Sequence, residues 1–374
     1  MDQILLFIAT SFLITFLIFP IYIKILKKKD FLDDPGGRKI HTAKTPAMGG
    51  LPIFVGFGIS LLLWSNLEIL REVKYVIGSV SLMFLIGFRD DLINLKAFQK
   101  LFGQIAAALI VVAVCDIRLN SLYGLFGFHE IPLWLSYALS TFTIIVITNA
   151  YNLIDGIDGL AGSIGLIASL FFGIWFYLNG SIGLSSISLA LAGALIAFLN
   201  FNWAPSKIFM GDTGSLFIGF FLSIAAIAFI DQNSTLSNSE FVFMGGIGTA
   251  IAILIIPLAD TLRVFIKRIA RGKSPMHPDR THTHHILLRL GCNHAQATGI
   301  LVTVNVIFVL LVLVLKSLSD AVVVPVVLVT ALSLSTILDY IFKSAIRKRK
   351  EELREQNRQN RSEGKIIQLD KNVG

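Results

Sequence analysis

The chain has 374 residues, of which 55% are hydrophobic and only 15% charged, and its mean hydropathy is +0.75. This composition excludes a soluble domain with one core and indicates a polytopic membrane protein. The net charge of +8 comes from segments at one predicted membrane face. It therefore favours anionic lipid and phosphate as partners there, and it does not imply nucleic acid.

The apolar windows predict an all-α integral membrane protein with ten or eleven transmembrane helices. Residues 4–23 read as the first span and not as a cleaved signal peptide, because no basic residue precedes them and no small-residue cleavage site follows. We expect residues 1–342 to form the membrane domain and residues 343–374 a basic cytoplasmic tail. The predicted spans lie at about 4–26, 48–65, 73–88, 101–117, 133–151, 160–178, 184–201, 214–230, 241–262, 297–315 and 321–342.

The distribution of basic residues predicts the orientation. With the N-terminus outside and the C-terminus in the cytoplasm, 28 of the 32 Lys and Arg residues fall on the inner side. Cys115 and Cys292 then lie at opposite faces, so we expect no disulfide between them. The polar clusters that carry chemistry all fall on the inner side, although they were not used to set the orientation.

The segment NLIDGIDGLAG, residues 152–162, stands between two spans and holds Asp155 and Asp158. Carboxylates three residues apart share one face of a helix. An acid at the bilayer centre costs roughly 2.5–3.5 kcal/mol on insertion scales, so this pair requires a cation or a water-filled cavity. The alternative is a helix-cap and turn cluster, since Asp-Gly is a common loop signal.

Further acids and glycines lie at the inner ends of other spans. Asp90 and Asp91 are adjacent, and neighbouring carboxylates repel unless a cation or a basic group such as Lys100 compensates them. Asp212 lies in a Gly-Asp-Thr-Gly turn, three residues after Phe209, an aromatic ring that stacks on a base or packs at the interface. Carboxylate oxygens without thiolates suit Mg²⁺ or Mn²⁺.

A basic loop completes the inner face. His282, His284 and His285 follow Pro278-Asp279-Arg280. Zinc is one reading of the histidines, but no Cys is near and adjacent histidines point in different directions. A cluster of His and Arg facing phosphate fits better beside these acids. Together the clusters predict a metal-dependent enzyme that handles phosphate at the cytoplasmic face of a membrane.

The motifs TPAMGG, RDD, NLIDGIDGL, NFNWAPSKIFMGDTGS and PDRTHTHH, in this order, resemble the polyprenyl-phosphate N-acetylhexosamine-1-phosphate transferase family. The resemblance covers residues 1 to about 342. PDRTHTHH is similar to the WecA-like branch, because Thr283 interrupts the run of three histidines typical of the muramoyl-pentapeptide branch. Some relatives carry a Lys where this chain has Phe98, which puts phosphate contacts in that loop in doubt.

The resemblance implies transfer of N-acetylglucosamine-1-phosphate from UDP-N-acetylglucosamine to undecaprenyl phosphate, with release of UMP. The product is the lipid-linked diphosphate sugar that starts cell-envelope polysaccharide synthesis. It further implies Mg²⁺, a location in the bacterial inner membrane and a homodimer as a candidate assembly. The implied catalytic residues are Asp90, Asp91 and Asp212, with Asp212 and Asp91 on the metal. The implied substrate-binding residues are Asn152, Asp155, Asp158, Phe209, Lys100, His282, His284, His285 and Arg280.

Several alternatives stay open at this point. Another UDP-N-acetylhexosamine or UDP-muramoyl-pentapeptide is the alternative to UDP-N-acetylglucosamine as the donor. Direct attack by the lipid phosphate competes with a covalent aspartyl-phosphate intermediate. A cation-coupled transporter would place acids in the middle of spans and show a repeat, and neither is seen. A CDP-alcohol phosphotransferase would need an Arg and a second acid pair after Asp158-Gly159.

Overall fold

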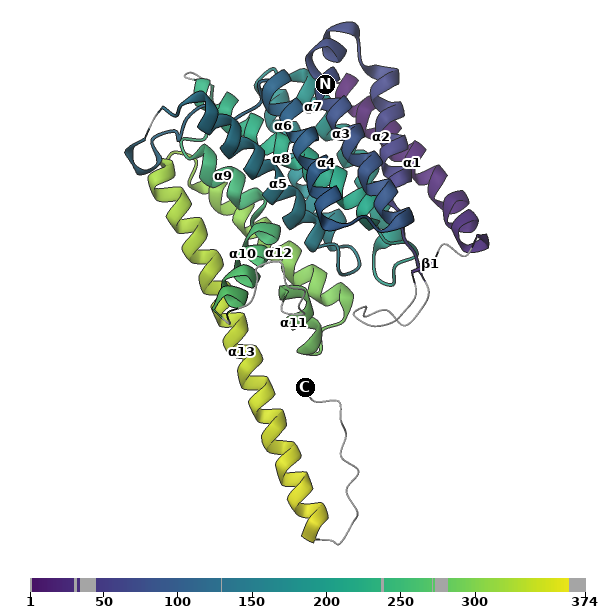
Figure 1. Ribbon diagram of the computed structural model, residues 1–374, viewed down its shortest axis with the longest axis vertical. Helices are drawn as coiled ribbons and strands as arrows, with labels where there is room; N and C mark the ends of the chain where they lie inside the picture. The colour runs from purple at the N-terminus through teal and green to yellow at the C-terminus, as the bar shows by residue number, and fades with distance from the viewer. Residues whose placement is uncertain are drawn as a thin grey trace.

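The computed structural model describes residues 2–29, 32–33, 45–128, 130–236, 239–270, 272 and 282–362. In this part of the chain the regular structure is helical apart from one antiparallel pair of two-residue strands and an isolated bridge between Ser121 and Glu130, and Figure 1 shows the helices gathered into one bundle. This confirms the predicted fold class. The elements are α1 Asp2–Lys28, β1 Leu32–Asp33, β2 Thr45–Pro46, α2 Gly50–Trp64, α3 Leu67–Ile93, α4 Ala97–Val114, a 3₁₀ turn Leu125–Gly127, α5 Leu133–Leu153, α6 Leu160–Leu178, α7 Ile182–Asn202, α8 Gly211–Thr235, α9 Gly246–Ile253, α10 Ile255–Ile269, α11 Thr283–Arg289, α12 His294–Val314 and α13 Asp320–Ser362.

Helix α8 is the centre of the bundle. Its most apolar stretch is buried along its whole length, whereas only 22% of the residues in the corresponding stretches of α1 and α13 are buried. It packs against α2, α3, α5, α6 and α9. A helix that is apolar on all sides belongs in the interior, so the sequence of α8 explains its place.

Glycines bring the neighbouring helices close to the start of α8. A Cβ added at Gly50 would lie 2.2 Å from the backbone nitrogen of Gly214, and one at Gly87 would lie 2.3 Å from the carbonyl oxygen of Asp212. Small residues allow this kind of close backbone approach between membrane helices. The first turn of α8 is therefore fixed between α2 and α3.

The predicted span 241–262 is wrong as a single straight helix. The chain instead forms α9 and α10, which are bent by 83° to each other. Pro257 has no N–H to donate to the carbonyl of Ile253, four residues earlier, and that carbonyl accepts from Asn305 Nδ2 at 3.3 Å instead. The break thus has a local cause and a partner on α12.

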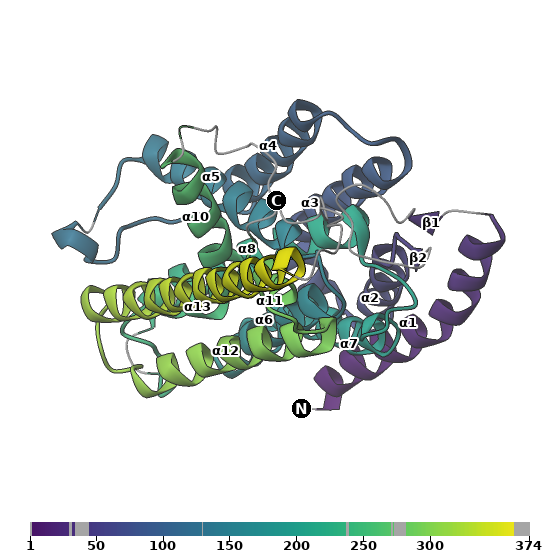
Figure 2. The same ribbon diagram turned by 90° about the horizontal axis from the view of Figure 1, so that it is seen from below.

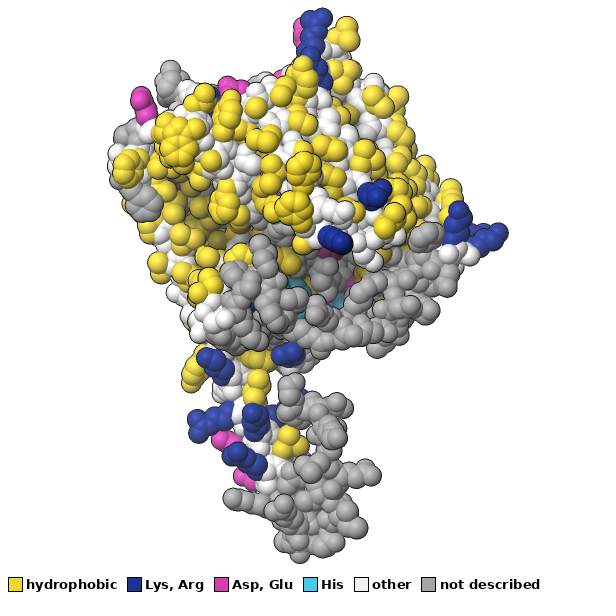
Figure 3. All heavy atoms as spheres, in the orientation of Figure 1, with side chains coloured by type: hydrophobic (Ala, Val, Ile, Leu, Met, Phe, Trp, Pro, Cys, Tyr) yellow, Lys and Arg dark blue, Asp and Glu magenta, His cyan; other side chains and the backbone are white. Residues whose placement is uncertain are grey.

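Eight described helices are long and apolar enough to cross a membrane, or nine if α9 and α10 count as one span. With 15 residues, α2 is short, and α3 carries charged residues near both ends. The number of ten or eleven spans and the outside N-terminus therefore stay predictions. Figure 3 shows the apolar side chains that cover the side of the bundle, as a membrane protein requires.

Helix α13 runs along α9 and α10 and then projects beyond the bundle (Figure 1). The predicted tail from residue 343 onwards therefore begins as a continuation of α13, and it is described as far as Ser362. Figure 2 views the end of the bundle from which α13 projects, and it shows β1 and β2 beside the end of α1. We call this the acidic end, because the loops and helix ends that carry Asp90, Asp91, Asp155 and Asp212 meet there.

Candidate active site

The first turn of α8 is held by Asp91, the last-turn acid of α3. One oxygen of Asp91 accepts the backbone N–H of Asp212 at 2.9 Å, and the other accepts the N–H and the hydroxyl of Thr213 at 2.8 and 2.5 Å. Gly211 has a φ of +73°. A Cβ at this position would also lie 2.7 Å from Asp91 Oδ2. Asp91 thus supplies the acceptors that the free N–H groups of a helix start require.

Asp212 is the meeting point of the predicted site residues. Its Oδ1 accepts from Asn152 Nδ2 at 2.5 Å, and its Oδ2 lies 3.3 Å from Lys100 Nζ. Lys100 also forms a close ion pair with the buried carboxylate of Asp90. Asn152 donates further to Ser215 Oγ at 2.7 Å. The structure therefore brings Asp90, Asp91, Lys100, Asn152 and Asp212 into one network from α3, α4, α5 and α8.

Asp155 lies in the turn between α5 and α6, beside this network, and its side chain is half-buried. Burial, followed by the negative charges of Asp212 and Asp91, raises the pKa of Asp155 to about 8. The carboxyl therefore binds a proton at neutral pH unless a cation replaces it. Such a group in a cluster of acids is typical of a functional site.

Asp158, in contrast, is used to hold loops together. Its oxygens accept the N–H and the hydroxyl of Ser206 at 3.1 and 3.0 Å, and His294 Nδ1 lies at 3.4 Å. Thr298 of α12 donates to its carbonyl at 2.7 Å. Burial alone would raise the pKa of Asp158, but the bonds from His294 and Ser206 outweigh burial and lower it. Substrate binding by Asp158 stays a prediction.

The histidine motif begins with a second helix cap. Asp260, in α10, accepts the N–H and the hydroxyl of Thr283 at 2.6 Å each, and its other oxygen lies 2.7 Å from His282 Nδ1. The short helix α11 starts at Thr283. Asp260 thus fixes the start of α11 and the ring of His282.

His284 connects α11 to the acidic loop, which is the segment between α5 and α6 that carries Asp155 and Asp158. A Cβ added at Gly156 would lie 2.5 Å from His284 Nε2, so the ring sits directly against the backbone next to Asp155. Burial, followed by the neighbouring His285, lowers the pKa of His284 to about 3. His284 is therefore neutral at physiological pH, and its ring centroid lies 4.3 Å from that of the half-buried His285.

Phe209 lies in the loop before α8, and β2 and the start of α2 hold its backbone. Its N–H donates to the carbonyl of Pro46 at 2.9 Å, and its carbonyl accepts from Gly49 at 2.8 Å. The predicted TPAMGG and NFNWAPSKIF motifs therefore meet. The ring is half-buried, and stacking on a base stays a prediction. Arg280 lies outside the described residues, so its predicted role is likewise open.

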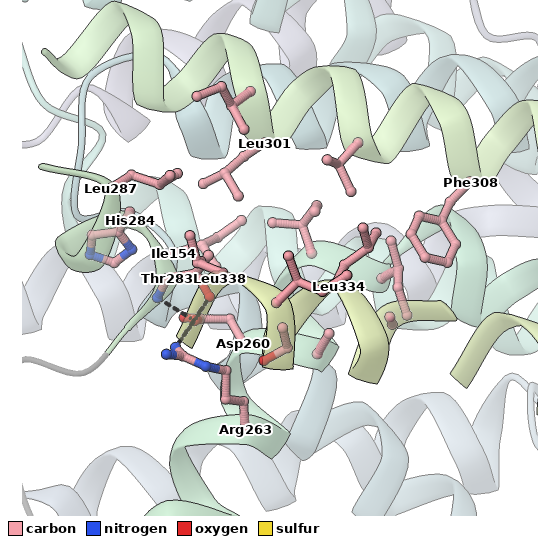
Figure 4. Close-up of a pocket in the computed structure, with 18 of the residues that line it drawn as sticks. Ile154, Asp260, Arg263, Thr283, His284, Leu287, Leu301, Phe308, Leu334 and Leu338 are labelled. Atoms are coloured by element: carbon pink, nitrogen blue, oxygen red, sulfur yellow. Dashed lines mark hydrogen bonds and ion pairs between the residues drawn. The ribbon is translucent and has the colours of Figure 1, made fainter. Parts of the chain in front are cut away.

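An apolar cavity of about 250 Å³ adjoins the acidic end. Figure 4 shows Asp260, Arg263, Thr283 and His284 at one end of it and Phe308 at the other. Ile154 and Leu160, which flank the acidic loop, belong to its wall. The remaining lining residues come from α10, α11, α12 and α13 and are mostly aliphatic.

Within the described ranges, no group of three His, Cys, Asp or Glu residues is arranged to hold a metal ion. Mg²⁺, however, usually takes only one or two protein carboxylates together with substrate oxygens. Asp212 Oδ2 lies 3.3 Å from Lys100 Nζ, and the carboxyl of Asp212 also hydrogen-bonds to that of Asp90. Asp91 fits less well, because both of its oxygens already accept hydrogen bonds from α8.

Two residues of this region were missed by sequence reasoning. Asp260 and Asp339 lie inside the predicted spans 241–262 and 321–342, and a charged residue within a span is by itself a functional signal. Asp260 caps α11, and Asp339 pairs with Arg263 and Lys267 of α10. That signal would have found both.

Fold and site together define a polytopic membrane protein with an acidic centre at one end of its bundle and an apolar cavity beside it. The model of glycosyl transferase family 4 matches residues 73–230, which contain most of the acidic centre. The chain is 32% identical to the probable undecaprenyl-phosphate N-acetylglucosaminyl 1-phosphate transferase of Bacillus subtilis, over 85% of this chain and 86% of that protein.

Two further relatives agree with this match. The chain is 34% identical to the decaprenyl-phosphate N-acetylglucosaminephosphotransferase of Mycolicibacterium smegmatis, over 70% of each chain. It is 30% identical to the undecaprenyl-phosphate alpha-N-acetylglucosaminyl 1-phosphate transferase of Escherichia coli K12, over 78% of this chain and 80% of that protein. The chain belongs to glycosyl transferase family 4, and the resemblance inferred from its motifs is confirmed.

Proposed function

We propose that this protein transfers N-acetylglucosamine-1-phosphate from UDP-N-acetylglucosamine to undecaprenyl phosphate and releases UMP. One observation carries the proposal. Ile154 and Leu160, which flank the loop between α5 and α6, belong to the wall of an apolar cavity, and Asp155 of this loop lies beside Asp212. A site for a charged donor and a site for a lipid are thus adjacent.

The cavity is the proposed place for the part of the polyprenyl chain nearest the phosphate. Its polar end, with Asp260, Arg263, Thr283 and His284, lies towards the acidic loop (Figure 4). A lipid phosphate at this end would approach the Asp212 network while its tail stayed among aliphatic side chains. This arrangement supports an active site at the inner surface of a bacterial plasma membrane, as the basic residues predict.

The acidic centre suits a divalent cation. Within the described residues, Asp90, Asp91, Asp155 and Asp212 lie close together, and Lys100 forms ion pairs with two of them, Asp90 and Asp212. The acids outnumber this cation even with a proton on Asp155, so the cluster carries excess negative charge. We place Mg²⁺, with Mn²⁺ as its substitute, on Asp212. Bound there, the ion would neutralise charge on the diphosphate and on the departing UMP.

The chain's own residues then position the reacting groups. Asn152 and Lys100 hold the two oxygens of Asp212 in place. The acceptor phosphate has a second pKa of about 6 and is mostly a dianion at pH 7, so it needs little help from a base. Since no strong base is needed, the role of Asp90 is to orient Lys100 through their ion pair. Any residual acceptor proton passes to a carboxylate of this cluster. We favour direct in-line attack on the β-phosphate.

The test is transfer of radiolabelled sugar into lipid by the purified protein with undecaprenyl phosphate and Mg²⁺. UDP-N-acetylglucosamine is compared with UDP-N-acetylgalactosamine and UDP-muramoyl-pentapeptide. We expect label in lipid from the first donor only, its loss in EDTA, and its loss in Asp212→Asn. Absence of transfer from every donor by folded protein would refute the reaction, and a sugar-phosphate adduct trapped on an Asp would refute direct attack.

A further inference from the structure

Helix α13 carries one carboxylate near each end of its bundle segment, and each contacts a different half of the broken helix. At the start of α13, the buried Asp320 accepts the backbone N–H groups of Ile247 and Gly248, at 3.2 and 2.7 Å. These two groups belong to the first turn of α9. Asp320 is thus a cap for α9 supplied by another helix.

Near the acidic end, Asp339 of the same helix contacts α10. One of its oxygens pairs with the guanidinium of Arg263 and the other with the ammonium of Lys267. Arg263 and Lys267 are four residues apart on α10 and so share a face. The side chain of Arg263 is only 4% exposed. Arg263 Nη1 also lies 4.0 Å from Asp260 Oδ1, so Asp339 is the closer of two carboxylates that face this buried guanidinium. Removing a close partner of a buried charge leaves that charge poorly compensated, and the contact therefore favours a carboxylate at position 339.

The contacts continue from Asp339 to the histidine motif. Arg263 Nη1 lies 3.5 Å from Thr283 Oγ1, whose hydroxyl donates to Asp260 at 2.6 Å. Asp260 holds the start of α11, and His284 of α11 sits against Gly156. A line of polar contacts thus runs from α13 through α10 and α11 to the acidic loop.

We propose that Asp339 is a positioning residue that locks α10 to α13 and thereby sets α11, with His284, against the acidic loop. The cavity supports this role, because it lies along α13 between the two anchors and has Ala331, Leu334 and Leu338 in its wall. Asp320 and Asp339 are 19 positions apart in sequence, which is roughly 28 Å along a helix. Helix α13 therefore contacts both halves of the helix that bends by 83°, through Asp320 at α9 and Asp339 at α10. The contact of Asp339 sets the part of the site that carries His282 and His284.

The chain contains a natural reporter of the position of α11. Cys292 lies three residues after the end of α11, its N–H donates to the carbonyl of Leu287 at 3.2 Å, and its side chain is half-buried. The sequence has one other cysteine, Cys115, at the C-terminal end of α4. In a Cys115→Ser background, the rate of maleimide labelling of Cys292 reports how firmly α11 is held.

The experiment compares Asp339→Asn, Asp339→Glu and Asp320→Asn in this background, as full-length protein purified in detergent. We expect Asp339→Asn to raise the labelling rate of Cys292 at least threefold and Asp339→Glu to restore most of the protection. Asp320→Asn, the matched loss of a buried carboxylate on the same helix, should leave the rate within a factor of two. An unchanged rate in Asp339→Asn, or equal increases in both Asn variants, would overturn the proposal.

Kinetics give a second readout, which rests on the proposed function. Asp339→Asn should raise the KM for undecaprenyl phosphate severalfold and the KM for UDP-N-acetylglucosamine by a smaller factor, because α10 lines the cavity whereas the acidic loop is reached only through the contact of His284 with Gly156. Equal changes in both KM values would contradict a role that acts first on the cavity. If even the parent protein transfers no sugar, the reaction assignment fails, while the labelling of Cys292 still decides the role of Asp339.

If Asp339→Asn does not fold, Lys267→Gln removes one of the two ion pairs and should give a smaller increase in labelling.

Discussion

Two helix starts at the acidic end are held in the same way by a carboxylate from another segment. Asp91 accepts the backbone N–H and the hydroxyl of Thr213 at the start of α8, and Asp260 accepts the same two groups of Thr283 at the start of α11. In both cases the helix start carries a residue of the predicted site. Asp212 stands beside Thr213, and His284 stands beside Thr283.

The two starts differ in what surrounds them. Helix α8 is a buried 25-residue helix with backbone contacts to α2 and α3, whereas α11 has seven residues and depends on α10. The acidic side is therefore fixed by the core of the bundle, and the histidine side by a few polar contacts. The same kind of cap, a carboxylate from another segment, thus holds two different parts of the site. We call the part around the start of α8 the rigid or acidic half, and the part around α11 the adjustable or histidine half.

The largest effect is expected from Asp212→Asn, because it removes the charge at the meeting point of the rigid half. Sugar transfer at saturating substrates should fall at least about a hundredfold, the scale on which loss of a group that stabilises a developing charge acts. The protein should still fold, since Asn keeps an acceptor for Asn152. Label transfer and detergent melting temperature are measured side by side. Near-normal transfer would remove Asp212 from the centre of the mechanism.

The two caps can be compared directly through Asp91→Ala and Asp260→Ala. Each buried donor left without an acceptor costs about 1–3 kcal/mol. Asp91→Ala should lower the melting temperature more, because the tightly packed start of α8 cannot rearrange, while Asp260→Ala should mainly lower transfer. Thermal melting and transfer rates are measured for both variants. A larger loss of stability in Asp260→Ala would reverse the assignment of the rigid and the adjustable half.

Metal dependence should vary with pH because of Asp155. With its pKa at about 8, Asp155 carries a proton below that pH, and a cation bound at the neighbouring Asp212 must drive this proton off. The apparent affinity for Mg²⁺ should therefore rise by up to about tenfold per pH unit between pH 6 and 8 and level off above. Asp155→Asn should flatten this slope. The pKa of His284 is about 3, so this residue stays neutral over the range and is not the source of the slope.

The smallest effects are expected from two glycine substitutions, which probe the same contrast. Gly50→Ala would place a Cβ 2.2 Å from backbone of α8, and Gly156→Ala would place one 2.5 Å from the ring of His284. Backbone cannot yield, so Gly50→Ala should cost about 1–3 kcal/mol of stability. Gly156→Ala should leave melting within a few degrees and reduce transfer severalfold. Similar melting temperatures for the two variants would argue against a rigid acidic half.

The acidic half of the site was largely predictable from the sequence. Asp90, Asp91, Lys100, Asn152 and Asp212 stand at ends of apolar segments that the positive-inside distribution places on one side. Their convergence in one network follows from that placement. The role of each residue could not be predicted, because spacing along the chain does not tell whether a carboxylate faces a ligand or a backbone N–H. Asp91 and Asp158 both accept from backbone N–H groups.

The histidine half was less predictable. Hydropathy averages over a window, so the run 241–262 read as one span although Pro257 removes a donor close to the bend. Asp260 was overlooked because it lay within that run, and its partner Thr283 was noted only as an interruption of the histidines. The contact of His284 with Gly156 joins segments 128 positions apart in sequence, which no local pattern can indicate.

The position of His284 has a thermodynamic consequence. Its side chain lines the apolar cavity and also rests on the turn next to Asp155, so it belongs to both halves of the site. A molecule that fills the cavity and shifts this ring changes the energy of the acidic loop. By linkage, a ligand bound at the acidic loop must change affinity in the cavity by the same factor. Donor and acceptor are thus expected to bind with a measurable coupling free energy, reciprocal between the two and transmitted by one imidazole.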